Sequence, residues 1–292
     1  MTTTGIVLCG GRSSRMGRDK PWLPWRGQPV LAHVVEQLGQ AVDEVLVVSA
    51  PGQALPPTAA RQVEDQEEGL GPLAGLRAGL SASAEGLVFV TAADAPFLTP
   101  AFVAAVLARG GAAAPEAQGR VQTLSAAYPA KAWRDAEALL AQGKRRPLDL
   151  LERLGFERLS LDDLPDPDSI RGFNTPSEYL AAVRADAPGE MARVSLEDPD
   201  RGAAEEQRVP VGTLGEILVS AGADTELLEG DRLTAPYVAC LDGRIPLRDA
   251  RVPIGAGEQI RLIKTEASTR DSATIEHGHD TEPDPMKRKS KA

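Results

Sequence analysis

The chain of 292 residues has little cysteine, no long apolar run and no excess of positive charge, and each shortage excludes a class of protein. Its two cysteines, Cys9 and Cys240, lie far apart, so neither a disulfide framework nor a cysteine metal site is expected. No apolar run is long enough to span a bilayer, and the opening residues lack the charged segment of a signal peptide. The formal net charge of -10 argues against nonspecific binding to nucleic acid. We expect a soluble cytoplasmic protein, with room for a local basic patch that binds a small anion.

The chain is rich in apolar residues, 42% of the total, in runs that alternate between strand-like and helix-like as far as about residue 186. Strand-like runs such as "GIVLCGG", "DEVLVVSA" and "GLVFVTAAD" alternate with helix-like runs such as "VLAHVVEQLGQ", "GPLAGLRAGLSAS" and "PAFVAAVLARGG". This alternation predicts an α/β domain with a mostly parallel, Rossmann-like sheet and helices on both faces. Because the pattern breaks at Pro188-Gly189, we predict one domain over residues 1–187 and a second over 190–267.

The second segment has the order strand, strand, helix and then further strands, which predicts a small α+β domain. Its helix follows Thr213, and Glu216 completes the spacing of a capping box. The order resembles the β-grasp fold, and more narrowly the small sulfur-carrier proteins of molybdopterin and thiamine synthesis. Those carriers act through a free C-terminal Gly-Gly, whereas here the last strand continues through Lys264 into a polar tail, residues 268–292, that is expected to be disordered. We therefore expect docking or scaffolding, with other cofactor-synthesis proteins or molybdoenzymes as partners.

The stretch "LCGGRSSRMGRDK", residues 8–20, directly follows the first apolar run. A bound phosphate chain needs close approach of the backbone, exposed N–H donors and positive charge. Glycines allow the approach, serine hydroxyls donate, arginine offers a planar fork and lysine a compact charge. In this stretch these residues are Gly10, Gly11, Ser13, Ser14, Arg15 and Lys20. The stretch has neither the G-x-G-x-x-G spacing nor the G-K-[ST] ending, so it is no dinucleotide fingerprint or Walker loop, and a plain surface loop is the alternative.

As a whole, L-C-G-G-x-S-x-R-M-G-x-D-K resembles the signature of nucleotidyltransferases that act on sugars and cofactors, and is most similar to that of the molybdenum cofactor guanylyltransferases. Three further matches follow in the family's order: "EDQEEGLGPLAGL" at 64–76, "TAADAPFL" at 91–98 and "RGFNTPSEYL" at 171–180. The resemblance covers nearly all of the first domain. It implies transfer of GMP from magnesium-bound GTP to the terminal phosphate of molybdopterin or its molybdenum form, with release of pyrophosphate.

The resemblance also implies roles for particular residues. Catalysis is assigned to Arg15, Lys20 and Asp94, and the magnesium ion (Mg2+) to Asp94. Binding of the nucleotide and acceptor is assigned to Leu8, Cys9, Gly10, Gly11, Ser13, Lys20, Asp65, Asp94 and Asn174. Local sequence leaves alternatives: Asp94 can begin a surface turn, and Asp65 can be an exposed acid within "EDQEE". Asn174 can instead cap the helix that starts near Pro176.

Physical chemistry supports the two carboxylates in these roles. Asp94 follows "GLVFVTAA" and is expected at the carboxyl end of a strand, where one carboxylate can reach a magnesium ion that bridges phosphates. Asp65 offers only acceptors, which suit the N1–H and N2–H donors of guanine. The basic stretch "GKRRP" is a candidate site for the pterin phosphate, with a solvated loop as the alternative. Six further residues are interpreted as core or lining positions: Cys9, Met16, Trp22, Trp25, His33 and Cys240.

Two other functions stay open at this point. A sister cytidylyltransferase would use the same loop, and the pair Gly10-Gly11 together with Asp65 favours guanine over it. A non-enzymatic scaffold that delivers cofactor to partner proteins is the second alternative. Nucleotide competition distinguishes the first alternative, and release of pyrophosphate distinguishes the second.

Overall fold

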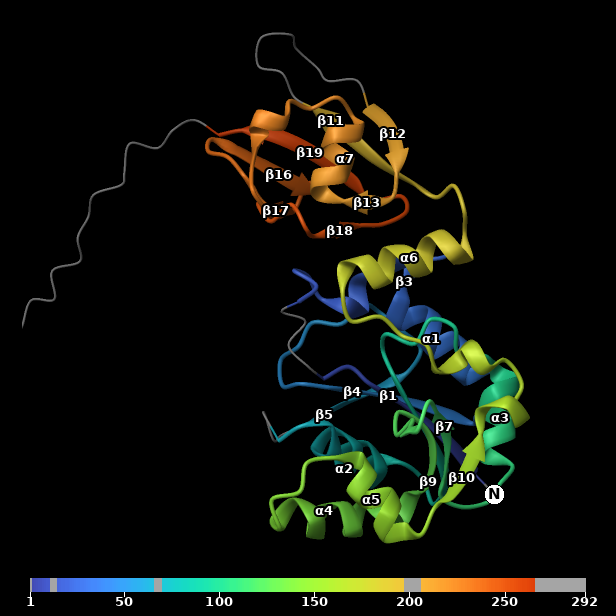
Figure 1. Cartoon of the computed structure of the whole chain (residues 1–292). Coiled ribbons are helices and arrows are strands. Elements are labelled where there is room, and N and C mark those ends of the chain that lie inside the picture. The colour runs from blue at the N-terminus through green and yellow to red at the C-terminus, as the bar shows by residue number, and fades with distance from the viewer. Residues whose placement is uncertain (1, 11–14, 66–69, 197–205, 266–292) are drawn as a thin grey trace, which may run out of the picture.

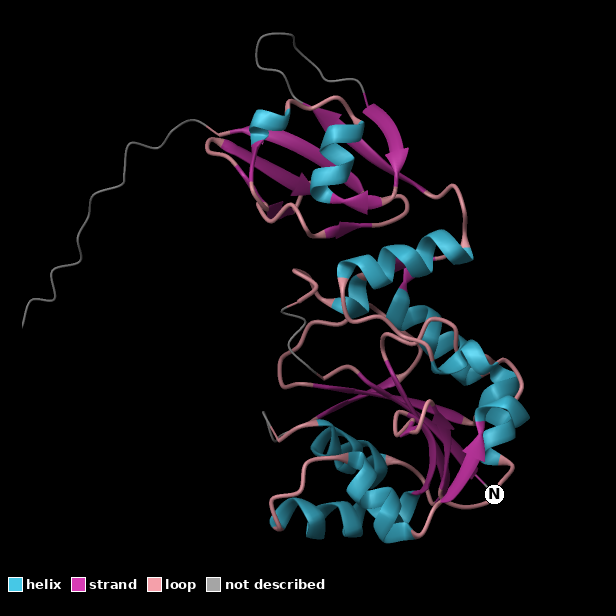
Figure 2. Cartoon of the chain, viewed as in Figure 1, coloured by secondary structure: helices cyan, strands magenta, loops and turns pink. Residues whose placement is uncertain are grey.

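The computed structural model describes residues 2–10, 15–65, 70–196 and 206–265. These residues form two regions, one built around a large sheet and one around a smaller sheet (Figures 1 and 2). We call them the N-terminal region, up to residue 186, and the C-terminal region, from residue 191. The predicted disorder of residues 268–292 falls outside the described residues.

The sheet of the N-terminal region is mostly parallel, as the alternating pattern predicts. From one edge to the other its strands are β5 (Arg61–Glu64), β4 (Glu44–Ser49), β1 (Thr2–Leu8), β6 (Gly86–Ala92), β9 (Ser125–Pro129), β7 (Ala113–Ala117) and β10 (Glu157–Ser160), with β8 (Arg120–Val121) paired to β7. Strand β9 is antiparallel to both its neighbours, and the short β8 is antiparallel to β7. Strands β5, β4, β1 and β6 are parallel to one another, so their carboxyl ends meet at one edge.

Helices cover both faces of this sheet (Figure 2), because successive residues of its inner strands point to opposite faces and are apolar on both. In β1, Val7 belongs to one apolar cluster, and Ile6 and Leu8 belong to the other. The first cluster includes α1 (Val30–Gly39), α3 (Pro100–Leu107) and α6 (Pro176–Asp186), and the second includes α2 (Pro72–Ala82), α4 (Trp133–Ala141) and α5 (Pro147–Leu154). The short elements are β2 (Pro24–Trp25), β3 (Gln28–Pro29) and the 3-10 helices η1 (Lys20–Trp22), η2 (Ala130–Ala132), η3 (Leu161–Asp163) and η4 (Pro167–Ile170).

The core positions expected in this region are correct with one exception. Met16, Trp25 and His33 are buried, which confirms their interpretation as packing residues. Trp22 is 42% exposed and is not a core residue. It lies in the short helix η1 at the surface, where its indole N–H donates to the carbonyl oxygen of Ala54 at 3.1 Å.

The C-terminal region is a five-stranded sheet with one helix packed against it (Figure 1). Its strand order is β12 (Glu206–Pro210), β11 (Met191–Leu196), β19 (Gln259–Lys264), β16 (Tyr237–Leu241) and β17 (Ile245–Leu247). Strands β11 and β19 are parallel, and the other pairs are antiparallel. Helix α7 (Leu214–Ser220) begins at the predicted capping box of Thr213 and Glu216. The small elements are β13 (Gly212–Thr213), β14 (Leu228–Glu229), β15 (Arg232–Leu233), β18 (Pro253–Ile254) and η5 (Thr225–Leu227). The β-grasp assignment itself stays a prediction.

Cys240 is not a core residue of this region, which corrects its interpretation from the sequence. Its neighbours on β16, Ala239 and Leu241, are buried in the cluster that includes α7. Because strand residues alternate between faces, Cys240 points to the opposite face and is half-buried. Cys240 and Cys9 are both free thiols. Among the described residues, no helix has both the length and the apolar character needed to cross a membrane.

Candidate active site

Four neighbouring parallel strands end at one edge of the large sheet, and three of the predicted site residues, Gly10, Asp65 and Asp94, follow strand ends there. In spatial order, Asp94 follows β6, Gly10 follows β1, Ser49 ends β4 and Asp65 follows β5. Adjacent strands lie about 4.8 Å apart, so three spacings make this row roughly 14 Å long. A row of that length can hold the phosphates and the base of one nucleotide on different strands.

Lys20 connects three parts of the chain at this edge. Its Nζ donates to Asp94 Oδ2 at 2.5 Å, to the carbonyl oxygen of Phe173 at 2.8 Å and to Asn174 Oδ1 at 3.1 Å. A lysine ammonium has three N–H donors, so all of them are in use. The side chains of Lys20 and Asp94 are only 18% and 21% exposed, where water and salt screen an ion pair less than at the open surface. Three residues assigned to the site by the family resemblance thus lie together.

Asn174 faces Lys20 and does not cap α6, so the capping alternative is wrong. The N-cap of α6 is Thr175, whose hydroxyl accepts from the backbone N–H of Glu178, and Glu178 Oε2 accepts from the N–H of Thr175 in return. The same carboxylate oxygen accepts from the backbone N–H of Asn174 at 2.6 Å. This capping box fixes the loop and leaves the Asn174 side chain to Lys20. The T-x-x-E spacing is the sequence signal that identifies it.

Gly172 allows the loop before α6 to approach Asp94, and the sequence pattern did not identify it as a site residue. A Cβ atom at Gly172 would lie 2.6 Å from the backbone oxygen of Asp94 and 3.4 Å from its Oδ1. Glycine is therefore the residue that fits here without a shift of the backbone. Among the described residues Lys20 is the donor to the Asp94 carboxylate, through Oδ2, which leaves Oδ1 available to a further ligand.

Asp65 continues the contact between β4 and β5 one residue past the strand end, because its backbone N–H donates to the carbonyl oxygen of Ser49 at 2.8 Å. Its side chain is half-buried and lies over α2: Oδ2 is 3.7 Å from the position that a Cβ on Gly75 would take. Ser49 is buried, and its hydroxyl accepts from the side-chain amide of Gln62 at 2.9 Å. Asp65 thus lies at the same sheet edge as Asp94.

The residues at the end of β1 are buried. Leu8 is 8% exposed and Cys9 6%. Burial, and to a smaller extent the nearby Asp94 carboxylate, raises the pKa of the Cys9 thiol to about 12. Cys9 is therefore a neutral packing group at physiological pH and not a nucleophile.

The loop that follows is described in part. Gly10 is exposed, with open space where a side chain would stand, so its backbone is accessible to a ligand. Gly11, Ser13 and Ser14 lie outside the described residues. Arg15 is exposed and forms no ion pair within the described part of the chain, so its guanidinium is accessible at the end of this loop.

The basic stretch predicted to receive the acceptor lies beside the amino end of α2, where the carbonyl oxygen of Arg145 accepts from the backbone N–H of Leu73 at 3.3 Å. Arg146 and Lys144 lie 2.9 and 3.8 Å from the Asp149 carboxylate. The hydrogen bond from Arg146, with its charge, lowers the pKa of that carboxyl group. These two cations already share a local partner, and their role toward a phosphate stays a prediction.

The donors at the sheet edge fit a magnesium ion that is held mainly by phosphates. Such an ion prefers oxygen ligands and is usually bound by one or two carboxylates, phosphate oxygens and water. Asp94 Oδ1 is one carboxylate oxygen at this edge to which no described residue donates. No group of three or more His, Cys, Asp or Glu side chains able to hold a metal is found within the described ranges. A metal bound here would therefore depend on the phosphates of a ligand.

Comparison with known proteins agrees with this geometry. The family model described as a MobA-like NTP transferase domain matches residues 5–157, just over half of the chain. A curated protein from Mycobacterium avium, named probable molybdenum cofactor guanylyltransferase, is 34% identical over 196 residues, which are 64% of this chain and 98% of its own length. A protein of the same name from Mycobacterium tuberculosis is 34% identical over 186 residues, 60% of this chain and 92% of its own length.

Solved structures show the same fold. The molybdopterin-guanine dinucleotide biosynthesis protein A from Archaeoglobus fulgidus has a TM-score of 0.54 at 24% identity and covers 63% of this chain and 98% of its own. A nucleotidyl transferase from Methanothermobacter thermautotroptrophicus has a TM-score of 0.51 at 22% identity and covers 63% of this chain and 97% of its own. The family match includes Gly10, Asp65 and Asp94 and the ends of the strands that precede them. This chain therefore belongs to the family of MobA-like NTP transferase domains.

Proposed function

We propose that this chain transfers GMP from GTP to the terminal phosphate of molybdopterin or its molybdenum form and releases pyrophosphate. The observation that carries the proposal is the convergence of Lys20, Asp94 and Asn174 at the carboxyl edge of an NTP transferase sheet. The relatives named probable molybdenum cofactor guanylyltransferase support the choice of substrates. The cytoplasmic location and the partners of the C-terminal region stay predictions.

In this reaction an oxygen of the acceptor phosphate attacks the α-phosphorus of GTP. A new phosphorus–oxygen bond forms, the bond to the β-phosphate oxygen breaks, and pyrophosphate leaves with the electron pair. Such a transfer needs positioning and charge neutralisation more than a protein nucleophile. The neutral thiol of Cys9 therefore takes no part.

Asp94, through magnesium, and Lys20 would both neutralise the negative charge of the triphosphate. When bound, magnesium held by Asp94 would offset the negative charge of the triphosphate. Without a cation the carboxylate would repel each phosphate charge by about 1 kcal/mol in water, or about 4 kcal/mol at an effective dielectric of 20. Lys20 can reach a phosphate oxygen only by giving up one of its three acceptors. The two neutral acceptors, on Phe173 and Asn174, bind it less strongly than the carboxylate and are the ones it would exchange.

The remaining predicted residues would bind the ends of the nucleotide. Gly10 offers an accessible backbone and Arg15 an accessible guanidinium to the phosphates. Asp65, three strands from Asp94 along the row, would accept the N1–H and N2–H of guanine. Cytosine lacks that pair of donors, so this residue favours GTP over CTP.

The first test is titration calorimetry of the full chain with GTP, CTP and ATP, each with magnesium and again with a chelator. An assay of pyrophosphate release with molybdopterin as acceptor follows. Selective binding of GTP that weakens with chelator, and release that needs molybdopterin, support the proposal. Preference for CTP would indicate the sister class, and a chain that binds none of the three nucleotides would contradict an enzyme of this kind.

Asp94→Ala is the sharpest variant for the site. We expect it to reduce transfer by about 10³-fold or more, because the carboxylate that faces the phosphates is lost. Asp135→Asn is a matched control: Asp135 pairs with Arg153 at 2.7 Å, on helices α4 and α5, which carry none of the residues assigned to the site. The control should transfer GMP at the wild-type rate, and thermal melting should show that both variants are folded. Near-normal turnover by Asp94→Ala would exclude the metal assignment.

A further inference from the structure

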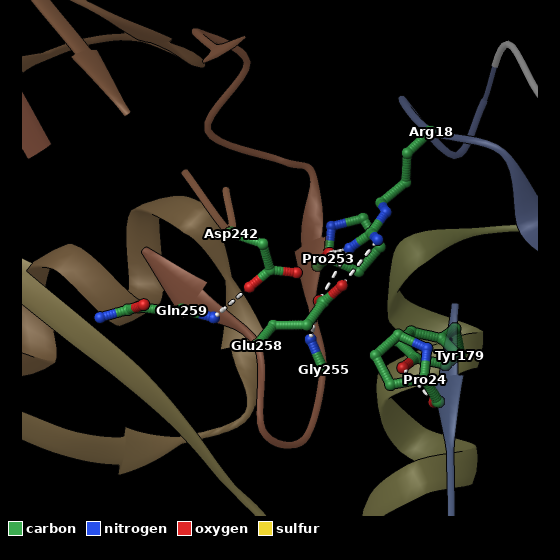
Figure 3. Close-up of polar contacts among 8 residues, drawn as sticks. All are labelled: Arg18, Pro24, Tyr179, Asp242, Pro253, Gly255, Glu258 and Gln259. Atoms are coloured by element: carbon green, nitrogen blue, oxygen red, sulfur yellow. Dashed lines mark hydrogen bonds and ion pairs between the residues drawn. The ribbon is translucent and has the colours of Figure 1, made fainter. Parts of the chain in front are cut away.

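The loop that carries Lys20 also contacts the C-terminal region, through Arg18 (Figure 3). Arg18 Nη2 donates to Glu258 Oε1 at 2.6 Å, and Nη1 donates to Glu258 Oε2 at 2.8 Å. Nη1 also donates to the carbonyl oxygen of Pro253 at 3.2 Å. The side chains of Arg18 and Glu258 are 12% and 8% exposed. A two-point ion pair, largely shielded from water, therefore joins residues 240 positions apart.

Glu258 is also held from its own side. It lies in the turn between β18 and β19, where its Oε2 accepts the backbone N–H of Gly255 at 2.8 Å (Figure 3). Strand β18 pairs with β13, and β19 lies inside the C-terminal sheet between β11 and β16. The carboxylate is thus a fixed acceptor, and the planar fork of Arg18 matches it in two places.

Apolar contacts also join the two regions. Gly17, at φ +71°, lies so close to Val252 that a Cβ atom would stand 2.9 Å from its Cγ2. Val211 belongs to the apolar core cluster that contains the helices α1, α3 and α6, and Ala256 packs against the same cluster. The C-terminal region is therefore packed against the N-terminal region around the loop and is not merely tethered to it.

Residues 16–20 are consequently held by contacts with both regions of the molecule. Lys20 is held inside the N-terminal region, Met16 is buried in its core, and Arg18 is held by the C-terminal region. Arg15, one of the residues assigned to the phosphates, directly precedes this anchored segment and is exposed. The position of its backbone depends on the contacts of residues 16–18.

We propose that the C-terminal region holds residues 15–20 in the conformation that binds nucleotide through the Arg18–Glu258 pair, which makes both of them positioning residues for the nucleoside triphosphate. The inference rests on the proposed function, because it takes the loop to bind a triphosphate. A loop that is already held loses less conformational freedom when its ligand binds, so affinity rises. By linkage, bound nucleotide in turn favours the docked C-terminal region.

The test is a double-mutant cycle in the full chain with Arg18→Gln, Glu258→Gln and the two together. Each single change removes one charge of the pair and keeps a polar side chain. We expect the KM for GTP to rise roughly five- to tenfold, with kcat changed by less than about twofold. The double variant should match the single ones, because the pair acts as a unit. An unchanged KM, or effects that simply add, would overturn the proposal.

Arg184→Gln is the matched control. Arg184 donates to the carbonyl oxygen of Val211 at 2.9 Å across the same boundary, but from α6 and not from the loop. We expect its KM for GTP to stay at the wild-type value. A rise equal to that of Glu258→Gln would show that general loosening of the two regions, and not the pair, sets the KM, and it would overturn the proposal.

Hydrogen exchange of the backbone amides of residues 15–18, measured without nucleotide, separates this inference from the proposed function. We expect faster exchange in Glu258→Gln than in the wild type and in Arg184→Gln. Unchanged exchange would overturn the inference even if the chain binds GTP. Faster exchange in a chain that binds no GTP would support the anchoring of the loop and would contradict the proposed function instead.

Discussion

Two cations of one loop, two residues apart, face opposite regions of the molecule. Lys20 contacts three acceptors within the N-terminal region, one of them the Asp94 carboxylate. Arg18 contacts one carboxylate of the C-terminal region at two points. A compact ammonium can exchange acceptors, whereas a planar guanidinium fixes an orientation. The difference shows how a single loop can serve chemistry at one residue and docking at its near neighbour.

Within this comparison of the two regions, the largest effect is expected from Lys20→Gln. We expect kcat/KM for GTP to fall by about 10²-fold or more, with most of the loss in kcat, because the charge between Asp94 and the phosphates is lost. In the same steady-state assay of pyrophosphate release, Arg18→Gln should change chiefly the KM. A Lys20→Gln enzyme that keeps the wild-type kcat would break the comparison between the two cations.

Gly172→Ala tests the N-terminal side of the comparison without removing a charge. The new Cβ would stand 2.6 Å from the backbone oxygen of Asp94, so the loop and the carboxylate must move apart. We expect a loss of stability of about 1–3 kcal/mol in urea unfolding and a lower kcat. Gly111→Ala is the control, because no atom lies within 4 Å of its added Cβ. Equal behaviour of the two variants would argue against tight packing at Asp94.

Gly255→Ala is the equivalent change on the C-terminal side. Its Cβ would clash with the hydroxyl of Tyr179 and would stand 2.8 Å from Cγ of Pro24, two residues that face it in Figure 3. We expect the docked contact to weaken by about 1–2 kcal/mol. Limited proteolysis should then cut residues 187–190 sooner, and the KM for GTP should rise while kcat stays. A fall in kcat like that of Gly172→Ala would remove the distinction between the two sides.

His33 offers the smallest effect and reports on the N-terminal core alone. Burial lowers the pKa of its imidazole from the ordinary value of 6.5. Below pH 6.5 the imidazole of the unfolded chain takes up a proton, while that of the folded chain stays neutral. The contribution of His33 to the free energy of unfolding is therefore complete above pH 6.5 and decreases as the pH falls. The slope is at most about 1.4 kcal/mol per pH unit. His33→Gln should flatten the unfolding free energy between about pH 7 and about pH 5.5.

His277→Gln is the control for this measurement, since it changes a histidine in the polar segment 268–292, which the sequence predicts to be disordered. It should keep the wild-type dependence on pH. A His33→Gln chain whose stability still decreases with the full wild-type slope would contradict a buried neutral imidazole.

The N-terminal sheet and the position of its site could be predicted because both depend on local patterns. Runs such as "IVLC" and "LVFV" are apolar at every position, as strands buried on both faces require. Once those strands are parallel, their ends must share an edge, and the charged residues that follow them must gather there. This rule places Gly10, Asp65 and Asp94 at one edge, whereas Lys20 lies well past the end of β1 and its role was predicted from the family resemblance.

The errors concern residues whose surroundings come from distant parts of the chain. Nothing local in "MGRDK" separates an arginine buried against Glu258 from a solvated one. Trp22 and Cys240 have side chains of the kind found in cores. Trp22 is nevertheless exposed, and Cys240 lies on the face of the C-terminal sheet opposite to α7. At α6 the signal was local: an asparagine is a good cap, yet Thr175 with Glu178 completes the box.

Val211 and Ala256 of the C-terminal region complete the apolar core of the N-terminal region. The Mycobacterium avium relative is matched over 98% of its length by 64% of this chain, so the rest of this chain has no counterpart in it. In this chain the C-terminal region forms part of the enzyme's interior. A chain that ends after residue 187 would expose to water the apolar side chains that Val211 and Ala256 now cover, and it would be prone to self-association. The fused C-terminal region thus acts like a permanently bound subunit: it is present at a ratio of one to one, and dilution does not dissociate it.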